Sequence, residues 1–232
     1  MSNLVLVRHG QSVWNKERRF TGFADIELTD VGKSEAEKAG HLIKALNIEF
    51  DECFTSELKR AINSLDIILK VLNKKNIKVS KAWELNERHY GGLTSLNKDD
   101  TIKKYGNKQV QIWRRSFDIP PPKMEEDHPY KNKINNKQIL SESLKNTADR
   151  VMKYYNENIR ILISQNKNIL VVFHGNSCRS LLMNLFKISK ERINEIEVPT
   201  GNPLFIKFGD NFNIQNYNYL DSNRAKKILF NI

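Results

Sequence analysis

Apolar residues occur along the chain in short continuous runs that predict buried strands. Residues 3–8 and 168–173 are the clearest of these runs, and residues 51–55 form a shorter one. A continuous apolar run indicates a strand that is covered on both faces, which is typical of a parallel sheet. Residues 77–80 are a weaker candidate for a further strand.

Between these runs, apolar residues recur at helical spacing and predict helices. The first helix begins near Thr29 or Asp30, and either side chain could cap it. The second follows Ser56, whose hydroxyl is also a candidate cap. Two later helices are expected, one beginning at Glu142 and one directly after Phe173.

The end of the chain has the pattern of a hairpin. Residues 204–208 and 214–219 are strand-like, and the turn-forming residues 209–211 separate them. Because strands alternate with helices before this point, we expect an α/β fold with an open, mostly parallel central sheet and helices on both faces. Residues 1–220 are interpreted as a single domain, and residues 221–232 as a basic C-terminal tail.

The periodic pattern weakens between about residues 85 and 140. This stretch contains two adjacent glycines, three consecutive prolines and a polar run from Lys131 to Lys137. A long irregular segment inside a compact domain is most often functional. We therefore predict an irregular lid insertion with short helices at about residues 88–140.

Two of the predicted strands end in the same dipeptide. His9-Gly10 follows residues 3–8, and His174-Gly175 follows residues 168–173. Ligands of open α/β sheets bind outside the carboxyl ends of the strands, so both pairs lie where a site is expected. A neutral imidazole can accept a phosphoryl group on one nitrogen while a backbone carbonyl holds the other as a donor. A glycine after His9 lets the backbone approach closely and leaves room for that group.

Phosphoryl transfer also needs positioned donors and a proton carrier. Arginine suits the first task because its planar fork binds phosphate through two donors. The candidate donors are Arg8, Asn15, Arg60, His174 and Asn176. Glu87 is the candidate general acid, and a nearby phosphate would raise the pKa of its carboxyl group. A structural ion pair is the alternative interpretation of Glu87.

The net charge of +11 fits either a nucleic acid or a small polyanion as the partner. Nucleic-acid binders usually gather basic residues into a stripe with aromatic residues between them. Lysines are instead spread widely here, so we expect a small anionic substrate and no nucleic acid.

Cysteine and histidine spacing predicts neither disulfides nor a metal site. Cys53 and Cys178 form no CxxC pair and are expected to be buried and reduced. His41, His89 and His128 lack ligand spacing to one another. The N-terminus leads directly into a strand, and no apolar run approaches the roughly 20 residues of a membrane helix. We therefore expect a cytoplasmic protein without a signal peptide or membrane contact.

The motifs together resemble those of a known family. Arg8-His9-Gly10-Gln11-Ser12 resembles the signature of the histidine phosphatase superfamily. Further segments are similar to the cofactor-dependent phosphoglycerate mutase branch of that superfamily: residues 14–16, 20–22, 55–61, 85–91, 96–98, 104–106, 113–115, 174–177 and 199–201. The resemblance runs in order from residue 4 to about residue 220.

The resemblance implies a role for each site residue. His9 is implied to be the phosphohistidine nucleophile and Glu87 the proton donor and acceptor. Arg8, Arg60 and His174 are implied to act with them on the transferring group. The residues implied to bind substrate are Asn15, Thr21, Gly22, Arg88, His89, Tyr90, Lys98, Arg114, Arg115, Gly175 and Asn176.

The resemblance also implies the reaction, which is the glycolytic interconversion of 3-phosphoglycerate and 2-phosphoglycerate. It implies that 2,3-bisphosphoglycerate is both primer and intermediate, that no metal takes part, and that the chain forms a homodimer or homotetramer. The family pattern is not followed at Thr94-Ser95, at residues 122–140, which look shorter, and in the tail. A phosphatase of the same superfamily, which would admit water to the phosphohistidine, is the alternative function.

Overall fold

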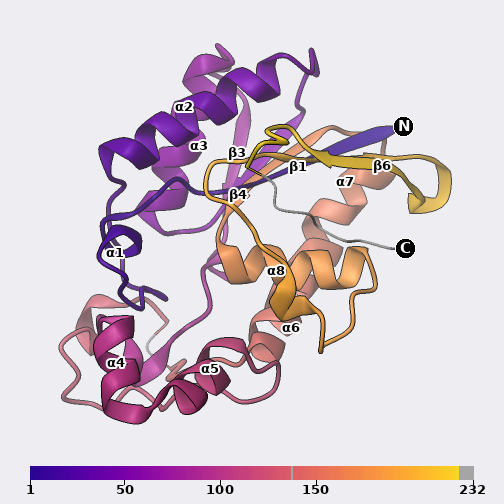
Figure 1. Cartoon of the computed structure of the whole chain (residues 1–232). Coiled ribbons are helices and arrows are strands. Elements are labelled where there is room, and N and C mark those ends of the chain that lie inside the picture. Colours follow the sequence, from indigo (N-terminus) through magenta and orange to yellow (C-terminus); the bar gives the residue numbers. More distant parts are fainter. Residues whose placement is uncertain (137, 225–232) are drawn as a thin grey trace.

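The computed structural model describes residues 1–136 and 138–224, which build a six-stranded sheet with the order β3-β2-β4-β1-β5-β6 (Figure 1). The first four strands in this order are parallel, and the last two run antiparallel to their neighbours. The strands are β1 (Ser2–Arg8), β2 (Glu52–Thr55), β3 (Lys78–Lys81), β4 (Ile169–Phe173), β5 (Leu204–Phe208) and β6 (Ile214–Tyr219). The predicted open, mostly parallel sheet and the closing hairpin are confirmed.

Helices cover both faces of this sheet (Figure 1). The α-helices are α1 (Val13–Lys16), α2 (Asp30–Lys44), α3 (Lys59–Val71), α4 (Lys98–Tyr105), α5 (Asn107–Arg115), α6 (Leu144–Tyr154), α7 (Arg160–Ser164) and α8 (Gly175–Leu185). A π-helical turn, η4 (Tyr155–Ile159), joins α6 to α7. The 3₁₀-helices are η1 (Trp83–Leu85), η2 (Gly91–Leu93), η3 (Lys131–Lys133), η5 (Ile193–Glu195) and η6 (Asp210–Phe212).

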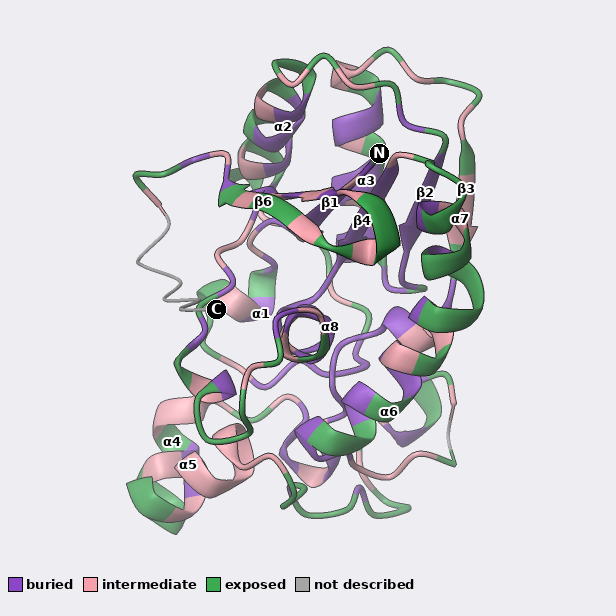
Figure 2. Ribbon diagram, turned by 90° about the vertical axis from the view of Figure 1, so that its right-hand side faces the viewer, coloured by how far each residue is buried: buried purple, intermediate pink, exposed green. Residues whose placement is uncertain are grey.

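The alternation of side chains along β1 explains why both faces are apolar. Leu4 and Leu6 pack into the core that α6, α7 and α8 share, whereas Val5 and Val7 pack against α2 and α3. Successive residues of a strand point to opposite faces, so an unbroken apolar run supplies both cores at once. Strand β4 is buried along its whole length and β1 along residues 4–7, as Figure 2 shows for the centre of the sheet. Each fully buried aliphatic side chain contributes about 1.5–3 kcal/mol to this packing.

The structure decides between the candidate helix caps. Thr29 caps α2, because its hydroxyl oxygen accepts the N–H of Gly32 at 3.1 Å. The prediction for Ser56 is wrong: α3 begins at Lys59, its N-cap residue is Leu58, and no side chain caps it. The Ser56 hydroxyl instead lies 2.7 Å from the ring of His174.

The insertion has its own small cores, which join it to the loop after α1. Phe20 from that loop packs with Leu93 and Val110, and Phe23 packs with Met124 and Ile134. The expected short helices are present as η2, α4, α5 and η3, while Lys137 lies outside the described residues.

Most of the predicted basic tail cannot be compared with the structure, because residues 225–232 lie outside the described residues. Within the part of the tail that is described, Asp221 pairs with Lys38 and Arg224 pairs with Glu35.

Both cysteines are buried and unpaired, as the sequence predicted. Burial raises the pKa of each thiol to about 12. Among residues 1–136 and 138–224, no helix combines the length and apolar character needed to cross a membrane.

Candidate active site

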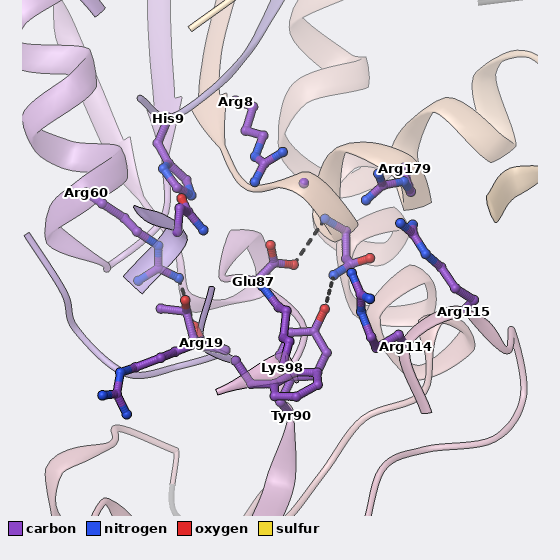
Figure 3. A pocket seen from close by; sticks show the side chains of 16 residues that line it. Arg8, His9, Arg19, Arg60, Glu87, Tyr90, Lys98, Arg114, Arg115 and Arg179 are labelled. Carbon is purple, nitrogen blue, oxygen red and sulfur yellow. Dashed lines mark hydrogen bonds between the residues drawn. The ribbon is translucent and has the colours of Figure 1, made fainter. Parts of the chain in front are cut away.

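A cavity of about 180 Å³ opens where β1 and β4 end, between the sheet and the insertion (Figure 3). Its walls contain seven cationic side chains and a single carboxylate, Glu87. The lining residues are Arg8, His9, Asn15, Arg19, Phe20, Thr21, Gly22, Arg60, Glu87, Tyr90, Lys98, Arg114, Arg115, Gly175, Asn176 and Arg179. Most of these lining residues are among the site residues predicted from the sequence.

His9 follows directly after β1 and is held as a neutral imidazole. Its Nδ1 lies 2.6 Å from the backbone oxygen of Gly10. A carbonyl can only accept, so Nδ1 carries the proton and Nε2 keeps a free lone pair. Burial and the nearby charges of Arg60 and Arg8 hold the pKa of His9 well below its ordinary value.

Gly10 allows a close backbone contact, as the sequence analysis expected. A Cβ at this position would lie 2.0 Å from the backbone oxygen of Gly32, at the start of α2. The close approach is therefore between the loop and the helix, and only a residue without a side chain allows it. The close backbone approach expected at Gly10 is confirmed, and the expectation that this glycine leaves space for a phosphoryl group stays a prediction.

His174 follows directly after β4 and is completely buried against His9. The two ring centroids are 4.9 Å apart and the rings meet edge to face at 62°. Burial, then the charges of Arg60 and Arg8, hold the pKa of His174 well below its ordinary value. The strand register explains this pairing, because β1 and β4 are aligned so that Arg8 lies opposite Phe173.

The guanidinium groups around the two rings are held by backbone carbonyls. Arg60 donates to the oxygens of Ala24 and Gly22, each at 2.8 Å, and Arg8 donates to the oxygen of Val198 at 2.8 Å. Burial lowers the pKa of Arg60 to about 10, which leaves it charged at neutral pH. Because carbonyls fix these groups without neutralising them, their positive charge remains available to an anion.

Glu87 is buried, and its Oε1 accepts two backbone hydrogen bonds, from Arg88 at 2.9 Å and from Asn176 at 3.0 Å. Burial alone would raise the pKa of Glu87, but these hydrogen bonds and the charges of Arg8 and Arg60 outweigh it and lower the pKa. The carboxylate is therefore ionised when no anion is bound, and the rise in pKa expected beside a phosphate stays a prediction.

Tyr90, Lys98 and Arg114 form the wall that belongs to the insertion. The Tyr90 hydroxyl accepts a hydrogen bond from the side-chain amide of Asn176 at 3.1 Å. Burial alone would raise the pKa of Tyr90, but the positive charge of Arg88, whose guanidinium carbon lies 4.7 Å from the ring centre, helps to lower it to about 8. This wall is therefore also strongly electropositive.

Two residues expected to bind substrate do not reach the cavity. Arg88 donates to the backbone oxygens of Trp113 and Arg114 at 3.3 and 2.9 Å. His89 packs against Phe23, with ring centroids 4.8 Å apart. Both residues lie behind the wall, so we interpret them as supports for it. His174 is also absent from the wall itself, although it contacts His9.

Three lining residues received no role from the sequence: Arg19, Phe20 and Arg179. Arg179 lies on α8 three residues after Asn176, and this helical spacing places both side chains on one face. That spacing was a usable signal. Phe20 belongs to the matching segment 20–22 and Arg19 directly precedes it, so their positions beside Thr21 were the only signal for either residue.

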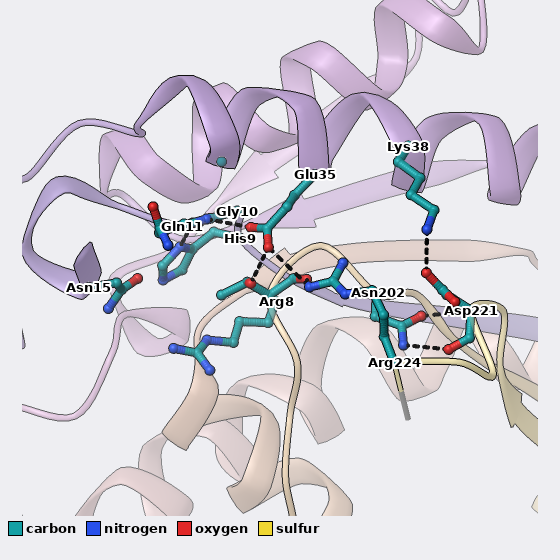
Figure 4. Close-up of polar contacts among 12 residues, drawn as sticks. Arg8, His9, Gly10, Gln11, Asn15, Glu35, Lys38, Asn202, Asp221 and Arg224 are labelled. Carbon is teal, nitrogen blue, oxygen red and sulfur yellow. Dashed lines mark hydrogen bonds and ion pairs between the residues drawn. The ribbon is translucent and has the colours of Figure 1, made fainter. Parts of the chain in front are cut away.

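The loop after His9 is anchored from outside the cavity by Glu35 of α2 (Figure 4). The Glu35 carboxylate accepts the N–H of Gln11 at 2.7 Å and the hydroxyl of Thr200 at 2.8 Å. It also accepts a hydrogen bond from Arg224 at 3.0 Å. Among the residues that the structure describes, no group of three or more His, Cys, Asp or Glu side chains is placed to hold a metal ion.

A family model for the histidine phosphatase superfamily (branch 1) matches residues 4–218. A 2,3-bisphosphoglycerate-dependent phosphoglycerate mutase of Pelagibacter ubique is 47% identical over 99% of each chain. The protein of the same name from Maricaulis maris is 45% identical over 98% of each chain.

Solved structures with the same fold are more distant in sequence. A phosphoglycerate mutase of Bacillus anthracis superposes with a TM-score of 0.67 at 20% identity, covering 88% of this chain and 87% of the other. A mycobacterial glucosyl-3-phosphoglycerate phosphatase gives a TM-score of 0.72 at 18% identity, covering 94% and 96%. At these identities the likeness establishes the fold alone.

Proposed function

Because this chain belongs to the histidine phosphatase superfamily, and within it to the 2,3-bisphosphoglycerate-dependent phosphoglycerate mutases, we propose that it interconverts 3-phosphoglycerate and 2-phosphoglycerate. The observation that carries the proposal is the neutral ring of His9, whose Nδ1 is held by Gly10 and whose Nε2 is free, in a cavity lined by seven cations. The reaction belongs to glycolysis and is an isomerisation by phosphoryl transfer.

His9 and Glu87 carry the two halves of the transfer. When His9 bears the phosphoryl group, a substrate hydroxyl oxygen attacks phosphorus, the P–N bond breaks, and Glu87 accepts the hydroxyl proton. The return transfer from the other ester oxygen forms the P–N bond again, and Glu87 gives its proton to the departing oxygen. The lowered pKa of Glu87 suits the first half, because an ionised carboxylate is ready to act as the base.

The bridging molecule would be 2,3-bisphosphoglycerate, which supplies the priming phosphoryl group and carries both phosphates between the two transfers. The cavity fits so strongly charged an anion, because carbonyls fix Arg8 and Arg60 without neutralising their charge. Arg8, Asn15, Arg60 and His174 would hold the transferring group. Tyr90, Lys98, Arg114, Arg115 and Asn176, with Thr21 and Gly22, would hold the carboxylate and the second phosphate.

We propose that the chemistry needs no metal and that residues of about 88–140 act as a lid on a single domain of residues 1–220. Lys98, Arg114 and Arg115 from this insertion form one wall of the cavity, so its movement would admit or enclose the substrate. Enclosure matters because a mutase must keep water from the phosphohistidine until the substrate has reoriented.

The test is the conversion of 3-phosphoglycerate, with a trace of 2,3-bisphosphoglycerate and excess EDTA, followed by ³¹P NMR. We expect 2-phosphoglycerate from the wild type and from His41→Ala, whose exposed histidine is the matched control, and none from His9→Ala. Release of inorganic phosphate without 2-phosphoglycerate would identify a phosphatase. Loss of activity in EDTA would contradict the metal-free mechanism.

We also propose that the chain forms a homodimer or homotetramer in the cytoplasm. Strand β3 lies at the edge of the sheet, with a neighbour on one side only among the described residues, and such an edge is a surface where a second copy can pair. Light scattering should give a mass two or four times the 27.1 kDa of one chain, whereas the mass of one chain would contradict this.

A further inference from the structure

The structure gives Ser56 a place beside the reacting histidines that its sequence pattern did not suggest. Ser56 directly follows β2 and is fully buried. Strands β2 and β4 are parallel with Thr55 opposite Val172, and the Thr55 hydroxyl donates to the backbone oxygen of Val172 at 2.7 Å. This register brings the residue after β2 close to His174, the residue after β4.

The hydrogen bonds of Ser56 determine the direction of its contact with His174. Its oxygen accepts the N–H of Leu58 at 3.2 Å and lies 2.7 Å from Nε2 of His174. If Nε2 were the donor, the hydroxyl proton of Ser56 and the lone pair of Nδ1 would both be buried without a partner among the described residues, whereas with Nε2 as the acceptor only the Nδ1–H group lacks one. The hydroxyl therefore donates to Nε2, and the ring proton of His174 resides on Nδ1.

The Nδ1 of His174 is itself buried without a hydrogen-bond partner among the residues described. The ring sits at the N-terminus of α8 in the arrangement of a capping box, where the hydroxyl oxygen of Ser177 accepts the backbone N–H of His174 at 3.2 Å. A buried N–H donor that lacks a partner usually has a role or an absent ligand. The ring centroid of His9, the proposed phosphoryl acceptor, is 4.9 Å away.

We infer that Ser56 is a positioning residue: its hydroxyl fixes the Nδ1–H tautomer of His174, so that His174 presents a ready donor to the phosphoryl group on His9. The inference rests on the proposed function, because the acceptor of the hydrogen bond from Nδ1–H is an oxygen of the transferring phosphoryl group. The contact is preorganised, since the strand pairing of β2 with β4 sets the separation of Ser56 and His174 before any substrate arrives.

The first experiment reads the tautomer directly, by long-range ¹H–¹⁵N NMR of protein labelled at its five histidines. The His174 signals are assigned from a His174→Gln spectrum. We expect the Nδ1–H tautomer in the wild type and in Ser56→Thr, which keeps the hydroxyl, and a mixture of tautomers in Ser56→Ala. An Nε2–H tautomer in the wild type would overturn the inference.

The second experiment measures kcat and KM for 3-phosphoglycerate in Ser56→Ala, Ser56→Thr and Ser180→Ala. Ser180 is a matched control, because it is also fully buried and its hydroxyl has no partner among the described residues. We expect kcat to fall roughly tenfold in Ser56→Ala with KM changed less than about twofold, since the lost contact acts on the transferring group. Ser56→Thr should recover most of this loss.

Equal kcat values for folded Ser56→Ala and Ser180→Ala would overturn the inference. If Ser56→Ala does not fold, the tautomer of His174 in the wild type still tests the inference. The failure of this inference is distinguishable from failure of the proposed function: an active mutase with the Nε2–H tautomer contradicts only the role of Ser56, whereas a wild type that makes no 2-phosphoglycerate contradicts the function itself.

Discussion

The arginine side chains around His9 are fixed by their contacts with the backbone, and this determines how they respond to substitution. Arg60 uses two nitrogens of its fork to bind Gly22 and Ala24, so the fork is oriented before an anion enters. Fixed donors cost no reorganisation when charge develops in the transition state. The geometry of Arg60, and not its charge alone, is therefore expected to matter.

We predict that Arg60→Lys lowers kcat by about 10²–10³-fold, because an ammonium group cannot make both carbonyl contacts and still present a planar donor pair. Arg18→Lys is the control, since Arg18 is exposed and pairs with Asp99 on the surface. Steady-state assays of both variants provide the measurement. A fully active Arg60→Lys protein would mean that positive charge is sufficient at this position.

His89 couples stability to pH. Burial lowers its pKa to about 4, against an ordinary value of 6.5, and its Nδ1 accepts the N–H of Gly91 at 2.9 Å. The unfolded chain takes up a proton near pH 6.5, but the folded protein does so only near pH 4. The contribution of His89 is therefore complete above pH 6.5 and is lost as the pH falls toward 4, by roughly 3 kcal/mol in total.

Urea denaturation between pH 4 and pH 7 tests this coupling. The free energy of unfolding should fall less steeply with acid in His89→Asn than in the wild type, because asparagine retains an acceptor and does not titrate. His41→Asn, at an exposed position, should keep the wild-type slope. An unchanged slope in His89→Asn would show that other groups are responsible.

At the scale of elements, the lengths and register of the strands bring the site together. His9 and His174 are far apart in the sequence, but His9 follows β1, His174 follows β4, and these two strands pair with each other. Apolar runs predicted both strands, and the rule that ligands bind at strand ends predicted the meeting of the two histidines. The role of Ser56 was not predictable in this way, because a serine before a helix usually caps it, and only the β2–β4 pairing reveals its other partner.

Ser95 is a position of the insertion that departs from the family pattern and has a visible backbone cost. Its φ is +73°, a left-handed conformation that disfavours side chains, and its N–H donates to the backbone oxygen of Phe20 at 2.8 Å. The chain must therefore hold this conformation to join the insertion to the loop after α1. Such a residue costs about 1–2 kcal/mol relative to the usual helical region.

We predict that Ser95→Gly raises the free energy of unfolding by about 0.5–1 kcal/mol, the relief of strain minus the greater freedom of glycine in the unfolded chain. Asn73→Gly provides a comparison, because Asn73 also has a positive φ, of 56°, but asparagine tolerates it better. Chemical denaturation of both variants gives the values. A destabilised Ser95→Gly protein would mean that the serine side chain contributes more than its backbone costs.

At the scale of the whole molecule, the excess of basic residues has a local meaning. The chain has 38 Lys and Arg residues against 27 Asp and Glu residues, and seven of the former line a cavity with a single carboxylate. Composition alone could not separate a nucleic-acid partner from a small polyanion. The fold favours the second, because it gathers cations from β1, α3, the insertion and α8 into one enclosed space.

Sequence motifs do not predict which side chains of the whole molecule point into the cavity. Motifs identified residues whose types are dictated by chemistry, such as His9, Arg60 and Glu87. They did not reveal which neighbours point inward: Arg179 lines the cavity, whereas His89 turns away and packs against Phe23. The orientation of a side chain depends on packing across the layers of the fold, and a local pattern does not contain that information.

The central claim is that phosphorus is transferred to Nε2 of His9. The most direct test is to incubate the protein with 2,3-bisphosphoglycerate, digest it at alkaline pH, and locate the phosphoryl group by mass spectrometry and ³¹P NMR. Because Gly10 holds Nδ1 as a donor, we predict a phosphoryl group on Nε2 of His9 and none in His9→Ala. A phosphoryl group on His174, on Nδ1 of His9, or on no residue would contradict the account.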